Sequence, residues 1–200
     1  MRRICVFCGS SPGARPGYRD AALALADALL ARNLGLVYGG GGVGLMGVLA
    51  GGVLAGGGEV IGVIPRDLVE KEVGHPGLSQ LLVVDTLFER KERMMELSDA
   101  FVALPGGVGT LDELFEVLTW LQLGHHSKPC GLLDVEGYYQ PLRDLLDRQV
   151  SERFLRSEHR GLLVEAHDPG ELLDELAAWR APAVDKWLDR SGPSRDGSDS

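Results

Sequence analysis

Three glycine-rich turns are the segments of this sequence best suited to hold an anion. They occupy residues 8–12, 39–47 and 105–110, and each stands between an apolar run and a helical pattern. Glycine lets backbone N–H groups approach an anion closely, and a helix that follows directs its unpaired N-terminal N–H groups to the same place. The third turn, Pro105-Gly-Gly-Val-Gly-Thr110, is the most distinctive because Thr110 adds a hydroxyl. Together the turns predict a phosphate-bearing ligand.

The acidic residues after the third turn have two interpretations. A helix is predicted to begin near Leu111, and Thr110-Leu-Asp-Glu113 has the spacing of a capping box, in which Glu113 bonds back to the N-cap N–H. Alternatively, Glu113 takes part in chemistry. A carboxylate beside a phosphate is electrostatically costly unless it faces the sugar instead. The spacing alone leaves both interpretations open.

The second turn contains Gly42-Val-Gly-Leu-Met-Gly47, which fits the dinucleotide-binding pattern G-x-G-x-x-G, and Asp67 lies 20 residues past Gly47. This pattern predicts contact with a pyrophosphate. However, it follows the second predicted strand rather than the first. The alternative is that its glycines permit a tight turn and close packing of helix against strand.

A charged run on the helix predicted after the fourth strand is the third candidate. Arg90, Lys91 and Met94 share one face of that helix, because residues three and four apart lie one above the other. The same run also suits a solvated helix on which Glu89 pairs with Arg93 at i, i+4. Residue types alone favour the solvated helix.

The cysteines and histidines do not form a metal-site pattern. Cys5-Val-Phe-Cys8 has C-x-x-C spacing, but it lies within a predicted strand, where positions three apart face opposite sides. His125 and His126 lack partners at metal-ligand spacing and are predicted at the surface. Patterns typical of zinc hydrolases and serine hydrolases are absent from the sequence. We therefore predict neither a metal nor another cofactor.

Predicted strands and helices alternate along the chain. The strands cover residues 3–8, 34–38, 59–64, 81–84, 100–104, 129–134 and 162–164, and the helices cover residues 18–32, 43–55, 87–97, 111–123, 138–150 and 170–179. Most strands are apolar without alternation, which is typical of strands covered on both faces. The order predicts an α/β fold with a doubly wound, mainly parallel sheet and helices on both faces. Residues 1–182 form the single predicted domain, and residues 183–200 are predicted to be a disordered tail.

Composition narrows the function classes. The chain has 200 residues, with 20 Lys+Arg against 29 Asp+Glu and a net charge of −9, which argues against a broad nucleic-acid-binding face. No apolar run approaches the roughly 20 residues of a membrane span. Three cysteines are too few for a disulfide framework. These features predict a cytoplasmic protein with neither a nucleic-acid nor a membrane partner.

Three motifs, in this order, resemble the LOG family of cytokinin-activating phosphoribohydrolases. They are Gly39-Gly-Gly-x-x-Gly-Leu-Met-Gly47, Arg90-Lys91-x-x-Met94 and Pro105-Gly-Gly-x-Gly-Thr-x-x-Glu113. The resemblance implies a Rossmann-like fold, a homodimer, and hydrolysis of N6-substituted adenosine 5′-monophosphates to free base and ribose 5-phosphate. We expect AMP to be hydrolysed in the same way. Many family members carry an older lysine decarboxylase label, but no pyridoxal phosphate site is recognisable around any of the four lysines here.

The resemblance also implies roles for individual residues. Arg90 and Glu113 correspond to the catalytic pair. The implied substrate-binding residues are Glu72, Lys91, Gly106, Gly107, Gly109, Thr110 and Thr119, and further loop contacts are expected at Ser10, Gly41, Gly42 and Met94. Cleavage of an N-glycosidic bond passes through an oxocarbenium-like sugar, so a carboxylate near C1′ stabilises positive charge and orients or deprotonates water. Arg90 stays protonated, so it suits positioning of phosphate or ribose better than proton transfer.

Three alternatives stay open on the sequence. An NAD(P)-linked oxidoreductase rests on the G-x-G-x-x-G pattern and Asp67, but it lacks an evident substrate domain within 200 residues. A non-catalytic nucleotide-binding or carrier module has no need for Arg90 and Glu113. A broader nucleoside 5′-monophosphate nucleosidase differs only in the base it accepts. The sequence does not distinguish an N6-isopentenyl substrate from AMP, because the base pocket depends on loop shape.

Overall fold

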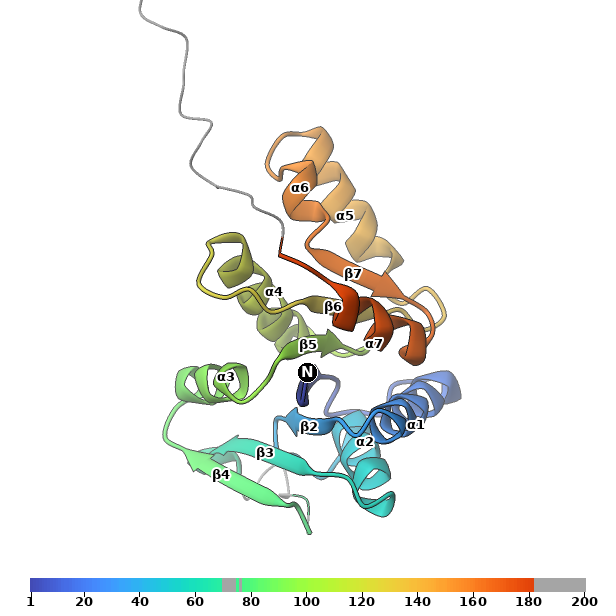
Figure 1. Cartoon of the computed structure of the whole chain (residues 1–200), viewed down its shortest axis with the longest axis vertical. Helices are drawn as coiled ribbons and strands as arrows, with labels where there is room; N and C mark the ends of the chain where they lie inside the picture. The colour runs from blue at the N-terminus through green and yellow to red at the C-terminus, as the bar shows by residue number, and fades with distance from the viewer. Residues whose placement is uncertain (70–74, 76, 182–200) are drawn as a thin grey trace, which may run out of the picture.

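The computed structural model describes residues 1–69, 75 and 77–181 of the chain. Within them, one sheet has the strand order β4-β3-β2-β1-β5-β6-β7, and every neighbouring pair is parallel (Figure 1). The strands are β1 (Arg3–Phe7), β2 (Gly35–Tyr38), β3 (Val60–Pro65), β4 (Gln80–Val84), β5 (Ala100–Ala103), β6 (Cys130–Leu133) and β7 (Leu163–Ala166). The apolar runs therefore predict each strand to within about two residues.

The helices are α1 (Pro16–Ala31), α2 (Gly44–Ala55), α3 (Leu87–Glu96), α4 (Val108–Gln122), α5 (Gln140–Ser151), α6 (Ser157–Arg160) and α7 (Pro169–Ala178). A 3₁₀ turn, η1 (Arg66–Leu68), follows β3. Helix α6 and η1 are not predicted from the sequence, because they are too short to show a helical period. In α1, by contrast, Ala22, Leu25, Ala26 and Leu29 are all buried, and their spacing follows the helical period.

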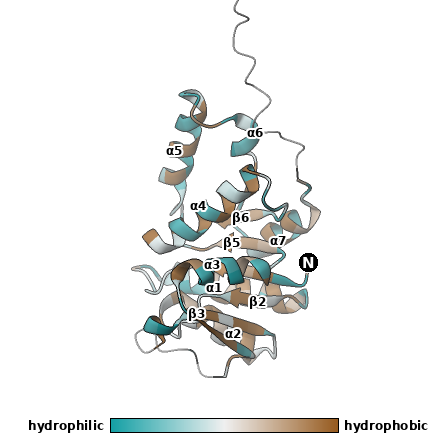
Figure 2. Ribbon diagram, turned by 90° about the vertical axis from the view of Figure 1, so that its left-hand side faces the viewer, coloured by the Kyte–Doolittle hydropathy of each residue, from teal (hydrophilic) through white to brown (hydrophobic). Residues whose placement is uncertain are grey.

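Helices cover both faces of the sheet. On one face, α1, α2 and α7 bury residues such as Leu25 and Leu172 in a single apolar cluster. On the other face, α3, α4 and α5 bury residues such as Met94 and Leu114 in a second cluster. Figure 2 shows hydrophobic strands and a largely hydrophobic α2, while α3 and α5 carry hydrophilic turns. The α/β, doubly wound architecture is thus confirmed, and the described strand pairs are all parallel rather than mainly so.

Strands β2 to β4 extend the sheet to one side of β1, and strands β5 to β7 extend it to the other side. The strand order therefore reverses at β1, which lies between β2 and β5. The three glycine-rich turns meet there. The Gly9 N–H donates to the Pro105 carbonyl (3.1 Å), and the Leu45 N–H donates to the Gly9 carbonyl (3.0 Å). A Cβ added to Gly9 would lie 3.4 Å from the Gly106 Cα, so these two turns touch backbone to backbone. Open α/β sheets bind their ligands at this kind of switch point.

Several smaller predictions can also be compared with the structure. Cys5 and Cys8 belong to the apolar clusters on opposite faces of the sheet, as predicted. His126 was predicted at the surface but is half-buried, with its Nε2 2.9 Å from the Val117 carbonyl and its ring tilted against Phe101. No helix among the described residues is both long and apolar enough to cross a membrane. Glu72 and the predicted tail lie outside the described residues.

Candidate active site

Arg90 is a buried arginine held in one orientation by the ends of two strands. Its side chain projects from α3 with the residue only 8% exposed. The Nε donates to the Val63 carbonyl (3.1 Å) and Nη2 donates to the Gly39 carbonyl (3.1 Å). A Cβ added to Gly39 would lie 1.9 Å from Nη2, so glycine at position 39 makes room for the guanidinium. Arg90 is therefore fixed, which contradicts the interpretation of this run as a wholly solvated helix.

Glu113 faces Arg90 from the neighbouring helix. Its Oε1 lies 4.0 Å from the Arg90 Nη2, and the two side chains are only 15% and 10% exposed. The Glu113 carboxylate is also close enough to β1 to contribute, after burial, to raising the pKa of Cys5 and of Cys8. The carboxylate therefore lies beside the switch point of the sheet, between its central strands and α3.

The capping-box interpretation of Glu113 is wrong. Helix α4 begins at Val108, three residues before the predicted start, and its N-cap is Gly107. Thr110 consequently lies inside the first turn, and Glu113 lies in the second turn, out of reach of the N-cap N–H. A capping arrangement occurs instead at α3, where the Thr86 hydroxyl accepts from the Glu89 N–H (3.0 Å) and the Glu89 carboxylate accepts from the Asp85 N–H (2.9 Å).

A cavity of about 260 Å³ lies where α3 and the first turns of α4 face each other. Its lining is both charged and apolar, and consists of Leu87, Phe88, Arg90, Lys91, Gly109, Asp112 and Glu113. A hollow of about 310 Å³ near His126 and His159 is larger, but the described residues that line it include neither a carboxylate nor a helix N-terminus. The smaller cavity is therefore a better candidate than this hollow for a site that holds a phosphorylated ligand.

Lys91 is the second cation of the cavity. Its Nζ lies 2.8 Å from a Glu116 carboxylate oxygen and 3.1 Å from an Asp112 oxygen. Partial burial by itself lowers the pKa of Lys91, but the hydrogen bonds to Glu116 and Asp112 outweigh burial and the pKa is raised. Lys91 therefore stays protonated at neutral pH and partly neutralises the acidic side of α4.

The turn before α4 presents backbone rather than side chains. Gly107 is an N-cap without a side-chain cap, and the first turn of α4 contains no acidic residue. A Cβ added to Gly107 or Gly109 would meet nothing within 4 Å, so the backbone there is open. Gly106 differs, because a Cβ on it would lie 2.1 Å from the Thr110 hydroxyl oxygen. Gly106 and the buried Thr110 thus shape the turn, and α4 begins beside open space, where the unpaired N–H groups of a helix N-terminus favour an anion.

The glycines of the G-x-G-x-x-G pattern have a packing explanation. Gly44 has φ of +62°. A Cβ on Gly44 would lie 2.2 Å from the Ser10 carbonyl carbon, and a Cβ on Gly47 would lie 2.2 Å from the Gly42 oxygen. The turn also follows β2 rather than a strand at the β1–β5 switch point, and Asp67 is exposed on η1. These contacts favour the packing interpretation over dinucleotide binding.

Some residues predicted from the resemblance lie away from the cavity. Met94 is 1% exposed and packs in the apolar core under the sheet. Thr119 is exposed on α4 and lines a separate hollow together with Phe115 and Leu146. Ser10 is exposed and Gly41 is buried, on turns that pack beside the site. The structure therefore gathers Arg90, Lys91, Gly109 and Glu113 from the predicted set.

Two contributors were missed by the sequence analysis. Gly39 supplies the carbonyl that orients Arg90, although it was noted only as part of a glycine run. Tyr138 donates its hydroxyl to the Gly106 carbonyl (2.5 Å), across a sequence separation of 32 residues. A Gly-Tyr-Tyr segment after β6 was the only local signal for Tyr138, and it does not specify this partner.

The family model described as "Possible lysine decarboxylase" matches residues 46–176, which include both α3 and the turn before α4. The chain belongs to this family. Among its relatives, the probable cytokinin riboside 5′-monophosphate phosphoribohydrolase LOGL2 of Oryza sativa subsp. japonica is 51% identical over 88% of this chain and 72% of its own length. The cytokinin riboside 5′-monophosphate phosphoribohydrolase LOG1 of Arabidopsis thaliana is 49% identical over 88% of this chain and 83% of its own length. The LOG-family resemblance is thus confirmed.

Solved structures with the same fold are more distant. The molybdenum cofactor carrier protein from Chlamydomonas reinhardtii aligns with a TM-score of 0.66 and 21% identity, over 90% of this chain and 99% of that one. The molybdenum cofactor binding protein from Rippkaea orientalis aligns with a TM-score of 0.66 and 20% identity, over 89% and 96% of the two chains. At these identities the likeness shows the shared fold alone.

Proposed function

We propose that this protein is a hydrolase that cleaves the N-glycosidic bond of cytokinin riboside 5′-monophosphates, releasing the free base and ribose 5-phosphate. One structural observation carries the proposal. A buried arginine–carboxylate pair, Arg90 and Glu113, lines the same cavity as Gly109 at the open N-terminus of α4. Relatives about half identical over most of the chain carry this activity in their names.

Glu113 supplies the charge that this reaction needs. As the bond between C1′ and the base breaks, its electron pair leaves with the base and positive charge develops on the sugar. A nearby carboxylate stabilises that charge and orients the attacking water. The water oxygen bonds to C1′, and a proton from water replaces the sugar on the base. Glu113 thus faces the sugar, which keeps it apart from the phosphate.

Arg90 and the glycine turn hold the rest of the substrate. The Arg90 guanidinium is anchored by two carbonyls, so it positions the ribose or phosphate and balances the Glu113 charge. The N–H groups of the first turn of α4, beginning at Gly107, bind the 5′-phosphate, since a helix N-terminus favours negative charge. Lys91 adds a protonated amine at the edge of the cavity.

A panel of nucleotides tests this proposal. Release of free base is measured by chromatography for N6-isopentenyladenosine 5′-monophosphate, AMP, GMP and CMP, each paired with its nucleoside. We expect base and ribose 5-phosphate from the adenine nucleotides and orders of magnitude lower kcat/KM for the nucleosides, because each charge-assisted bond to phosphate contributes about 1.5–3 kcal/mol. The proposal fails if no nucleotide of the panel releases its base.

We further propose that the protein acts as a cytoplasmic homodimer, without a nucleic-acid or membrane partner. Leu87 and Phe88 support the dimer, because these apolar residues of α3 are 57% and 60% exposed and would be covered by a second copy of the chain. Three free buried cysteines and a net charge of −9 fit a reducing compartment and a partner other than nucleic acid. Light scattering is expected to give twice the chain mass. A single-chain mass at every concentration contradicts the dimer.

A further inference from the structure

The loop between β6 and α5 holds the turn before α4 through two tyrosine hydroxyls. The Tyr139 hydroxyl donates to the Leu104 carbonyl (2.6 Å), and the Tyr138 hydroxyl donates to the Gly106 carbonyl (2.5 Å). Burial raises the pKa of Tyr139 well above its ordinary value, so that hydroxyl remains a donor. Tyr139 is 2% exposed, whereas Tyr138 is 41% exposed. Tyr139 therefore secures the core, and Tyr138 reaches the glycine turn itself.

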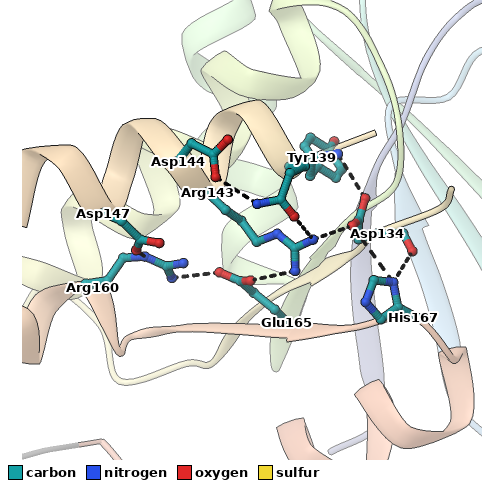
Figure 3. Close-up of polar contacts among 9 residues, drawn as sticks. Asp134, Tyr139, Arg143, Asp144, Asp147, Arg160, Glu165 and His167 are labelled. Carbon is teal, nitrogen blue, oxygen red and sulfur yellow. Dashed lines mark hydrogen bonds and ion pairs between the residues drawn. The ribbon is translucent and has the colours of Figure 1, made fainter. Parts of the chain in front are cut away.

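The position of Tyr138 is itself fixed by its neighbours. The buried Asp134 accepts from the Tyr139 N–H (2.9 Å) with one carboxylate oxygen and from the Arg143 guanidinium (2.9 Å) with the other (Figure 3). The ring of Tyr138 lies edge-on to Tyr139 at 5.0 Å and edge-on to Tyr18 of α1 at 5.8 Å. Tyr138 thus bonds to the glycine turn from a rigid support.

The Gly106 carbonyl belongs to the same planar peptide as the Gly107 N–H, and in a trans peptide these two groups point in opposite directions. Glycine stands on both sides of this peptide, so its rotation meets little steric resistance. A hydrogen bond that fixes the carbonyl therefore also fixes the direction of the N–H. Gly107 is the N-cap of α4, and the space beside it is open.

We infer that Tyr138 is a positioning residue for the 5′-phosphate: by holding the Gly106 carbonyl, it keeps the Gly107 N–H turned toward the phosphate before substrate arrives. The inference rests on the function proposed above. It predicts that loss of the hydroxyl weakens binding of the phosphate group without changing the chemical step, because the freed peptide must be ordered again each time substrate binds.

The test is Tyr138→Phe, which removes one oxygen and keeps the ring contacts. We expect KM for AMP to rise about three- to tenfold, the range given by one hydrogen bond, with kcat within about twofold. KM for adenosine, which lacks the phosphate, is expected to stay unchanged. The matched control is Tyr18→Phe, which removes the same atom from the ring packed against Tyr138 and is expected to change neither KM. Equal changes for AMP and adenosine, or no change for either, overturn the inference.

The preference of the wild-type protein for AMP over adenosine distinguishes failure of this inference from failure of the proposed function. If wild type does not prefer AMP over adenosine, the phosphate site and the inference both fail. If wild type prefers AMP and Tyr138→Phe keeps the full preference, only the inference fails. A second measurement needs no variant: saturating ribose 5-phosphate is expected to slow hydrogen exchange of the Gly107 amide, measured by NMR. Unchanged exchange at that amide overturns the inference.

Discussion

Two regions of this molecule bury arginines beside carboxylates, and they are built differently. In the cavity between α3 and α4, Arg90 and Glu113 stand 4.0 Å apart, and Arg90 gives two donors to backbone carbonyls. In the network of Figure 3, Arg160 lies 2.6 Å from one oxygen of Glu165, and Arg143 lies 3.5 Å from the other. Both regions join segments far apart in the sequence. Only the first lines the cavity at the open N-terminus of α4.

The difference shows that burial of charge does not by itself mark an active site. The Figure 3 network spreads its charge over close pairs, which include Arg160 with Asp147 (2.8 Å) and Arg143 with Asp134 (2.9 Å). These ion pairs connect α5 with α6, with β7 and with the residue that follows β6. The Arg90–Glu113 pair is longer and lies on the wall of the cavity at the N-terminus of α4, which is the arrangement expected of groups that act on a ligand. We therefore propose that the network stabilises the fold and that the pair acts in catalysis.

Among Arg90→Lys, Arg160→Met and Asp112→Asn, the largest expected effect on activity comes from Arg90→Lys. An ammonium cannot donate to the Val63 and Gly39 carbonyls while facing Glu113, because it lacks the planar fork of a guanidinium. We expect kcat/KM for AMP to fall about 10- to 100-fold and the free energy of unfolding to fall by about 1–3 kcal/mol. Steady-state kinetics and urea denaturation measure the two effects. Near-normal activity would place Arg90 outside the catalytic site.

Arg160→Met is expected to affect stability and leave activity in place. The change removes a guanidinium that pairs with both Glu165 and Asp147, and the Arg160 side chain is 20% exposed. We expect the free energy of unfolding to fall by about 1–3 kcal/mol, below the range for a fully buried pair because water screens this one. kcat/KM per folded molecule is expected to stay within about threefold of wild type. A large fall in kcat at full folding contradicts the separation of the two regions.

The smallest effect is expected for Asp112→Asn, which tests whether this cavity residue takes part in catalysis. The Asp112 side chain is 62% exposed, and Lys91 keeps its shorter contact with Glu116 when Asp112 is neutralised. Exposed ion pairs contribute about 0–1 kcal/mol, so stability is expected to change by less than that. KM for AMP is expected to stay the same or fall slightly, because one negative charge leaves the cavity. A tenfold fall in kcat would make Asp112 part of the catalytic machinery.

Most of the fold was predictable because its signals are local. Apolar runs predict the strands to within about two residues, and the rule for ligand sites in α/β sheets brings the glycine turns to one edge. The start of α4 was missed because its N-cap is Gly107, and Gly109 is a poor helix former inside its first turn. No serine, threonine or aspartate stands at the N-cap to mark the beginning of the helix.

The site was less predictable because its contacts are long-range. Residue types alone favoured a solvated Arg90, because the sequence does not show that the Gly39 carbonyl, 51 residues away, accepts from it. Thr119 and Met94 came from the resemblance, and their places away from the cavity follow from the packing of α3 and α4. Tyr138 reaches Gly106 through a loop from another strand, which no local pattern encodes.

The central claim is tested most directly by Glu113→Gln beside Glu165→Gln, with kcat for N6-isopentenyladenosine 5′-monophosphate and the free energy of unfolding measured on both. Glutamine keeps the shape of glutamate and removes its charge. We expect Glu113→Gln to lower kcat at least about 100-fold, while nucleotide affinity and stability stay close to those of wild type. Glu165→Gln is predicted to lower stability and keep kcat. Near-normal kcat in a stable Glu113→Gln variant would contradict the account.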